Sequence, residues 1–239
     1  AGPPPSQGRM TLKYFPIPGR AEPIRLAMVL GNLPFYDQRI PMSEWERKHK
    51  KAAPYGQLPL LVVEQTVIAQ SSAILRYVGS LAWYRGKPLY PAEPLVAAKV
   101  DEILSAFDDI WLVLASTYSI QSQSEKEEAR RAAFRPGGAA AAILDVMEKI
   151  LSAKDRGFIV SEAGGPTIAD LVMFCFLNML RSGFVDGLAA PANPFENFPR
   201  IMKHKDTIAT LPEVKAYYSK PAVSNPANVP YYQVFLPGK

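Results

Sequence analysis

The chain has 239 residues, of which 48% are apolar and 21% charged, as is usual for a globular protein with one large domain or two small ones. Its formal net charge of +5 comes from basic residues scattered among acidic ones, which argues against a nucleic-acid-binding face. No uncharged run is long enough to span a membrane, and the single cysteine, Cys175, leaves no pair for an internal disulfide or a Cys-x-x-Cys redox centre.

Residues 1–9 include three consecutive prolines and show no periodic apolar pattern. We expect them to be disordered, or to be an added sequence before Met10, which looks like a natural start. We recognise no hydrophobic region of a secretion signal, and a cytoplasmic location is therefore our expectation.

Residues 10–54 predict a β-α-β unit. A β-type run at 11–15 is followed by a proline-rich break, a helix at 20–30 and a second strand at 35–40. Strands joined through a helix pair in parallel by default, with a right-handed crossover. The polar, basic stretch 42–54 predicts a loop with a short helix.

Residues 54–77 predict a hairpin followed by a helix. Pro59 opens a buried strand at 60–63, and a turn leads into a second strand at 66–68. The helix begins around Gln70, with Ser71 or Ser72 as its N-cap. A helix start carries backbone N–H groups that bind a carboxylate or a phosphate, although a serine there commonly only caps the helix.

Residues 85–94 contain three prolines and predict a boundary between domains. We therefore place one domain at 10–84, a linker at 85–94 and an all-helical domain at 95–239. The apolar period beyond the boundary is helical throughout. It predicts a long helix at 95–119, further helices from about 139 to 152, at 168–181, 196–210 and 212–219, and an irregular aromatic tail at 225–239.

Two polar patterns in the second half have structural interpretations. The charge run at 125–131 predicts a solvated helix face with a Glu127–Arg131 pair. Thr167 and Asp170 form a capping-box pattern in front of an apolar helix. Cys175 lies in that apolar helix and is predicted to be a buried small hydrophobic side chain.

Three stretches together resemble the cytosolic glutathione transferases, closest to the sigma, mu and pi type. They are Tyr14 followed five residues later by Gly-Arg-Ala-Glu, the segment Gly56 to Leu61, and the pair Gln70-Ser71. The resemblance extends over residues 10 to about 220. It implies an α/β thioredoxin-like N-terminal domain and an all-α C-terminal domain. It also implies an enzyme that conjugates glutathione to apolar electrophiles as a homodimer.

By this resemblance, Tyr14 is the catalytic residue whose hydroxyl donates a hydrogen bond to the sulfur of glutathione. A strand tyrosine taken alone more often packs in the core. A free thiol with a pKa near about 8.5 is mostly protonated at neutral pH. Lowering that pKa by about two units needs roughly 2.7 kcal/mol, and one hydrogen bond to a charged group supplies about 1.5–3 kcal/mol. Arg20 adds positive potential, unless it only forms a salt bridge.

The same resemblance implies the residues that hold glutathione. The backbone just before a cis Leu58–Pro59 bond pairs with the cysteinyl part, and Gln57 precedes that position. Gln70 and Ser71 hold the γ-glutamyl carboxylate, and its ammonium meets Asp109 of a second subunit, with Asp108 as the neighbouring candidate. Trp45 and Lys50 hold the glycyl carboxylate, with Lys51 as the alternative because the spacing from Trp45 does not decide between them.

An electrophile pocket is expected between the domains. We expect Phe15, Trp111, Thr117 and Tyr118 to line it, and the tail aromatics Tyr231, Tyr232 and Phe235 either to cover it or to dock on the protein surface. Asp101, Asp108 and Asp109 resemble the metal cluster of some prostaglandin-synthesising relatives. Ser105 stands where one carboxylate is expected, so we expect no metal. Two alternatives stay open: a glutathione-dependent isomerase of the prostaglandin D synthase kind, and a non-catalytic protein related to lens crystallins.

Overall fold

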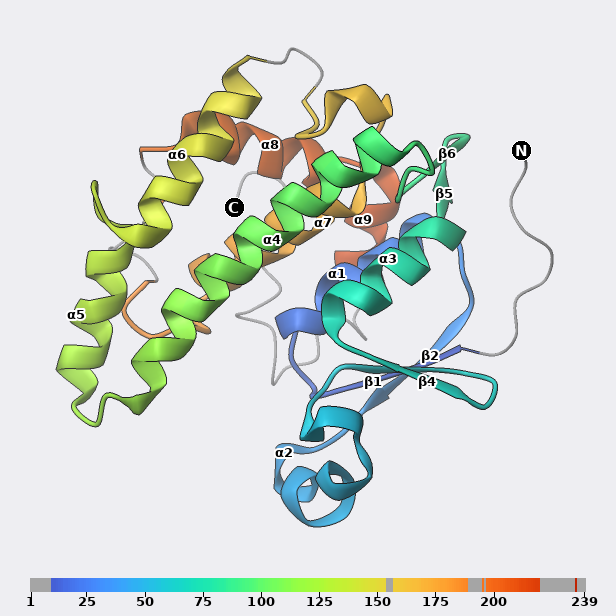
Figure 1. The fold of residues 1–239 in the computed structure, drawn as a ribbon, viewed down its shortest axis with the longest axis horizontal. Helices are drawn as coiled ribbons and strands as arrows, with labels where there is room; N and C mark the ends of the chain where they lie inside the picture. The colour runs from blue at the N-terminus through green and yellow to red at the C-terminus, as the bar shows by residue number, and fades with distance from the viewer. Residues whose placement is uncertain (1–9, 154–156, 189–194, 196, 220–234, 236–239) are drawn as a thin grey trace.

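The computed structural model describes residues 10–153, 157–188, 195, 197–219 and 235. A small mixed sheet with its helices forms one unit, and a set of longer helices packs against it (Figure 1). This is the predicted combination of a thioredoxin-like domain with an all-α domain. The predicted extension 1–9 and most of the aromatic tail lie outside the described residues.

The sheet has four strands in the order β2-β1-β3-β4. Strand β1 pairs in parallel with β2, as predicted, and antiparallel with β3, which continues into the β4 hairpin. Because side chains alternate along a strand, Tyr14 shares a buried face with Met10 and Leu12. The strands are β1 (Met10–Tyr14), β2 (Phe35–Arg39), β3 (Leu60–Val63) and β4 (Thr66–Ala69).

Helices α1 (Glu22–Leu30) and α3 (Ser71–Leu81) pack against each other between the sheet and the helical domain (Figure 1). The start of α3 corrects one prediction. Its N-cap is Gln70, with φ of 69°, and Ser71 is already the first helical residue. A positive φ is uncommon outside glycine, so the preceding hairpin sets this turn more than a serine cap does.

The basic stretch after β2 forms a projecting lobe of short helical turns (Figure 1). It contains α2 (Met42–Glu44), a π-helix at Trp45–His49 and 3-10 turns at Lys50–Ala52 and Pro54–Gly56. A π-helix hydrogen-bonds one residue further along the chain than an α-helix does.

The predicted linker is tied to both units by backbone hydrogen bonds. A small hairpin of β5 (Trp83–Tyr84) and β6 (Lys87–Pro88) leads into it. Leu89 is fully buried and its carbonyl accepts a hydrogen bond of 2.8 Å from the Ile168 amide, while the Tyr90 amide donates to the Gly79 carbonyl. These bonds hold the start of the helical domain against α3.

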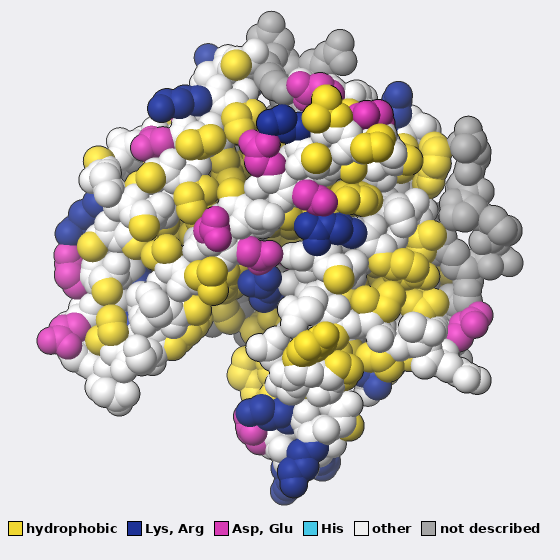
Figure 2. All heavy atoms as spheres, viewed as in Figure 1, with side chains coloured by type: hydrophobic (Ala, Val, Ile, Leu, Met, Phe, Trp, Pro, Cys, Tyr) yellow, Lys and Arg dark blue, Asp and Glu magenta, His cyan; other side chains and the backbone are white. Residues whose placement is uncertain are grey.

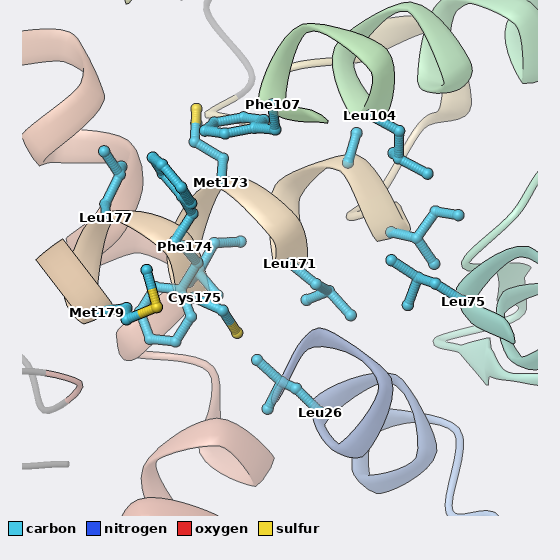
Figure 3. Close-up of a cluster of buried hydrophobic side chains, with 14 of the residues drawn as sticks. Leu26, Leu75, Leu104, Phe107, Leu171, Met173, Phe174, Cys175, Leu177 and Met179 are labelled. Carbon is cyan, nitrogen blue, oxygen red and sulfur yellow. The ribbon is translucent and has the colours of Figure 1, made fainter. Parts of the chain in front are cut away.

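The helical domain is built around α7, whose residues from Ile168 to Leu180 are almost all buried. Figure 3 shows side chains of α7 meeting Leu26 of α1, Leu75 of α3 and Phe107 of α4. Cys175 is buried there, as predicted. The helices are α4 (Pro94–Ser116), α5 (Gln123–Phe134), α6 (Ala139–Ser152), α7 (Ile168–Arg181), α8 (Pro199–Ala209) and α9 (Pro212–Tyr218).

The capping box at the start of α7 is present, as the sequence predicts. One oxygen of Asp170 accepts from the Thr167 amide at 2.7 Å, and its other oxygen accepts from the Ile159 amide at 2.8 Å. His204 of α8 lies 2.8 Å from that second oxygen. One buried carboxylate therefore joins the start of α7 to the segment before it and to α8.

Candidate active site

An open cleft of about 700 Å³ lies between the sheet unit and α4. The space-filling view shows a hollow between the α2 lobe and the C-terminal end of α4 (Figure 2). Its volume is in the range of small-molecule sites. Ten of the residues named from the sequence line it: Phe15, Arg20, Trp45, Gln57, Leu58, Pro59, Gln70, Ser71, Trp111 and Asp108, the last as the alternative to Asp109.

Tyr14 ends β1 with its ring packed in the core and its hydroxyl directed at the turn before α1. The side chain is 7% exposed and is not among the residues that line the cleft. The Arg20 amide donates a hydrogen bond of 3.2 Å to the Tyr14 oxygen. Burial raises the pKa of the phenol above its ordinary value of 10.0, and the Arg20 amide and the Arg25 guanidinium oppose part of that rise. The phenol is therefore protonated at neutral pH, and its own proton is left to donate.

Gly19 lets the α1 turn approach this hydroxyl closely. Its φ is +45°, and a Cβ at this position would lie 2.4 Å from the Tyr14 oxygen. Separations under 3.0 Å do not occur for real Cβ atoms. Only glycine meets both the backbone and the contact requirement here.

Arg20 joins the two units across the cleft. Its Nε donates to the Ser71 hydroxyl at 2.9 Å and its Nη2 pairs with Asp108 of α4. The Ser72 hydroxyl donates to the other oxygen of Asp108 at 3.0 Å. The guanidinium also lies 5.5 Å from the centre of the Trp111 ring. A hydroxyl has one donor and two acceptor sites, so Ser71 still has its own proton to donate.

The start of α3 and the loop before β3 bring backbone groups to the same wall. The peptide bond Leu58–Pro59 is cis. Gln57 is extended, with φ of −135° and ψ of 159°, and it lines the cleft together with Leu58 and Pro59. The positive end of the α3 dipole and the amides of its first turn face the same space, which favours an anionic group there.

The lobe contributes an aromatic pair and a lysine. Phe15 and Trp45 meet edge to face, with ring centres 5.8 Å apart. Lys50 forms an exposed ion pair with Glu46 at 2.8 Å, and its side chain lies near the Gly56 α-carbon at the cleft rim. Lys50 itself is not among the lining residues, and Lys51 is exposed beside it.

Three of the remaining predicted residues, Thr117, Tyr118 and Asp109, are not among the residues that line the cleft. Thr117 is buried, and its hydroxyl donates to the Leu114 carbonyl and accepts from Arg130. Tyr118 is 58% exposed beyond the end of α4. Asp109 is exposed on α4, whereas its neighbour Asp108 lines the cleft.

Phe235 is fully buried against Phe174 of α7 and Tyr218 of α9, with ring centres 5.6 Å and 4.6 Å away. It therefore packs inside the helical domain, and neither covers the cleft nor lies on the protein surface, which were the two expected positions. Tyr231 and Tyr232 lie outside the described residues.

Sequence reasoning did not assign several lining residues, among them Ser72, Leu112 and Ala115. On α4 the lining positions 108, 111, 112 and 115 have helical spacing, so one stripe of the helix faces the cleft. Extending that stripe from Trp111 at helical spacing finds Leu112 and Ala115, and it favours Asp108 over Asp109.

The described residues contain no group of three or more His, Cys, Asp or Glu side chains arranged to hold a metal ion. Among the described helices, none has the length and apolar character needed to cross a bilayer.

Comparisons with known proteins give a consistent result. Residues 10–80 match the family model of the glutathione S-transferase N-terminal domain, and residues 108–221 match that of the C-terminal domain. Glutathione S-transferase 4 of Caenorhabditis elegans is 30% identical over 86% of this chain and 93% of that protein. Hematopoietic prostaglandin D synthase of Gallus gallus is 26% identical over 87% of this chain and 94% of that protein. The structure of monomeric Na-GST-3, a glutathione S-transferase from the hookworm Necator americanus, has a TM-score of 0.68 at 26% identity and covers 87% of this chain and 95% of that one.

Proposed function

Because this chain belongs to the glutathione S-transferase family and is a glutathione transferase enzyme, we propose that Tyr14 activates glutathione as a thiolate. The sulfur then adds to the electrophilic carbon of an apolar substrate. The observation that carries the proposal is the Tyr14 hydroxyl, which accepts from the Arg20 amide and keeps a proton to donate.

The energetics support a single phenol as the activating group. The raised pKa of Tyr14, caused mainly by burial, keeps the hydroxyl a donor throughout the neutral range. A hydrogen bond to an ionised acceptor contributes about 1.5–3 kcal/mol, which is enough to lower a thiol pKa by roughly one to two units. The reaction needs no proton transfer from Tyr14, and the proposal includes no metal.

Glutathione carries a thiol, an ammonium and two carboxylates, and we assign one part of the cleft to each end. The γ-glutamyl carboxylate binds at the α3 start, where the Ser71 hydroxyl and the helix dipole act together. The cysteinyl backbone pairs with Leu58 before Pro59. The glycyl carboxylate binds near Trp45 and Lys50, which requires Lys50 to exchange its partner Glu46 for the peptide.

The apolar substrate binds on the opposite side, between Phe15 and the Trp111 stripe of α4. Leu112 is 68% exposed at this position, although it is a large apolar side chain. An exposed leucine in a cleft is suited to an apolar ligand that covers it. We keep Tyr118 in the proposal as an extension of this wall.

We also propose a homodimer, in which Asp109 of one subunit reaches the ammonium of glutathione bound in the other. Its exposed position on α4 supports this role. The related Na-GST-3 is described as monomeric, so the oligomeric state has to be measured. A cytoplasmic location, a role in detoxification and the domain limits 10–84 and 95–239 remain predictions.

A glutathione-dependent isomerase is the second candidate, because a prostaglandin D synthase is among the relatives. Both activities use the thiolate, so both depend on Tyr14. Parallel assays of aryl-halide conjugation and endoperoxide isomerisation with the purified chain separate them. If the chain binds glutathione and does neither, the non-catalytic alternative is correct.

The experiment for the proposal is a titration of thiolate absorbance with glutathione bound. We expect a thiol pKa about one to two units below that of free glutathione, and conjugation of an aryl halide at neutral pH. A bound thiol with an unchanged pKa would refute the proposed activation.

A further inference from the structure

Arg130 of α5 is a buried cation in a segment whose sequence predicts a solvated helix face. The run 125–131 does provide that face, since Arg131 pairs with Glu127 at 3.4 Å as expected. Arg130 instead turns inward and is only 3% exposed. Burying a guanidinium is unfavourable unless its donors find partners, so its partners indicate why the position holds arginine.

The guanidinium of Arg130 holds two consecutive residues at the end of α4. Its Nε donates to the Thr117 hydroxyl at 2.9 Å, and its Cζ lies 5.3 Å from the centre of the Tyr118 ring. Its Nη1 donates to the Asp186 carbonyl at 3.3 Å and lies 3.5 Å from a carboxylate oxygen of Asp186. Thr117 is fixed further, because its hydroxyl donates to the Leu114 carbonyl at 2.7 Å.

Helical spacing puts Tyr118 on the side of α4 that faces the cleft, although Tyr118 is not itself among the residues that line the cleft. It follows Ala115 by three residues and Trp111 by seven, and both of those line the cleft. Residues three and seven apart lie on one face of a helix, and the 3-10 turn Thr117–Ser119 prolongs α4 in the same direction. Burial is the main cause of the raised pKa of Tyr14, and the Tyr118 phenol adds to that rise, as expected for a group across the same gap.

We infer that Arg130 is a positioning residue for the apolar-substrate side of the cleft. It holds the Tyr118 side chain in place just beyond the α4 residues that line this side, Trp111, Leu112 and Ala115. The inference rests on the proposed function, since it assigns Tyr118 to that side. Tyr118 is 58% exposed, and the Arg130 guanidinium is a contact that restricts its ring. A single planar group that donates to Thr117 and lies over the Tyr118 ring restricts both residues together.

The test compares Arg130→Lys, which keeps the charge and loses the planar fork, with Arg131→Lys on the exposed face of the same helix. Two ligands are titrated, glutathione and S-hexylglutathione, because only the second reaches the apolar side. We expect Arg130→Lys to weaken S-hexylglutathione binding and raise the KM for the aryl halide by about 10- to 100-fold, with the glutathione Kd unchanged within about twofold. Arg131→Lys should change neither ligand.

A double-mutant cycle separates positioning from a general loss of structure. In a Tyr118→Ala background, Arg130→Lys should not further change the ratio of the Kd for S-hexylglutathione to the Kd for glutathione. An undiminished effect in that background, or equal losses for both ligands, would overturn the inference. If Arg130 variants fold poorly, Thr117→Val can replace them, because it removes the hydroxyl that accepts from Arg130 Nε. The Kd values for the two ligands are then compared in the same way.

A second measurement does not depend on the enzyme activity. With a fluorotyrosine at position 118, the wild type should give one sharp fluorine resonance that shifts or broadens in Arg130→Lys and stays unchanged in Arg131→Lys. An unmoved resonance in Arg130→Lys would refute the positioning role. A wild type that fails to bind glutathione would refute the proposed function, and this resonance would still test Arg130.

Discussion

Replacement of Gly19 by alanine perturbs the proposed activating hydroxyl without removing it. The new Cβ would lie 2.4 Å from the Tyr14 oxygen, 2.8 Å from Cε1 and 3.0 Å from Cζ. Ordinary contact begins at 3.4 Å, so the ring or the turn has to move by about 1 Å. In the wild type the Tyr14 oxygen lies 3.2 Å from the Arg20 amide, and this movement separates the two.

The expected effect has two parts that different assays measure. Alanine at a φ of +45° lowers the free energy of unfolding by about 1–2 kcal/mol, because a side chain crowds the backbone in that region. Displacement of the hydroxyl by about 1 Å lowers kcat/KM for conjugation by about 10- to 100-fold. The pKa of the bound thiol should rise by about one to two units, as the thiolate loses its donor.

Gly137→Ala is the matched control. Gly137 has a φ of +85°, and a Cβ there would meet nothing within 4 Å. It should lower stability by a similar amount, about 1–2 kcal/mol, and leave the thiol pKa and kcat/KM unchanged. In a Tyr14→Phe background, Gly19→Ala should cause no further rise of the thiol pKa. A folded Gly19→Ala enzyme with the wild-type thiol pKa would show that the position of the Tyr14 hydroxyl does not control the thiol.

Three further predictions concern the cross-domain contact, the helix cap and the alkaline limit. Arg20→Met, and separately Asp108→Asn, should raise the KM for glutathione by about tenfold with a smaller change for the electrophile, because each removes a contact that holds the α3 start beside α4; equal changes in both KM values would contradict this. Asp170→Ala should lower the free energy of unfolding in urea by about 3 kcal/mol, because it leaves the cap and the Ile159 amide without an acceptor, and a loss below about 1 kcal/mol would contradict the proposed anchoring. Burial raises the pKa of the Tyr14 phenol above 10.0 and that of the Cys175 thiol well above 9.0. The folded protein therefore favours the neutral form of both groups. Their contribution to the free energy of unfolding is complete below the pKa values of the unfolded chain, and it is lost as the pH rises through the pKa values of the folded protein. Urea unfolding from pH 8 to pH 11 should show a decline that Tyr14→Phe reduces, and an unchanged decline would contradict the assignment.

Local patterns predicted most of the fold correctly. The strands β1 to β4, the parallel β1–β2 pair and the capping box at Thr167 follow from alternation, spacing and side-chain chemistry that act within a few residues. The π-helix at Trp45 and the N-cap Gln70 were not predicted. Both depend on how the chain is held between neighbouring strands, and no local propensity records that constraint.

The site shows the same division. Residues next to strand ends and at the α3 start are brought together because the sheet fixes their positions, as for Phe15, Pro59 and Ser71. Residues on α4 depend on the rotation of a long helix packed against another domain. That rotation directs Asp108 into the cleft, leaves Asp109 exposed and buries Thr117. Arg130 could not be recognised in a charge run, because only tertiary contacts distinguish it from Arg131.

The most direct measurement is the thiol pKa of glutathione bound to the wild type and to Tyr14→Phe, read from thiolate absorbance across pH. Phenylalanine keeps the ring that packs beside Phe15 and removes only the hydroxyl. We expect a thiol pKa about one to two units below that of free glutathione in the wild type, and a return to near the free value in the variant. An equally low pKa in Tyr14→Phe would show that another group ionises the sulfur and would contradict the account.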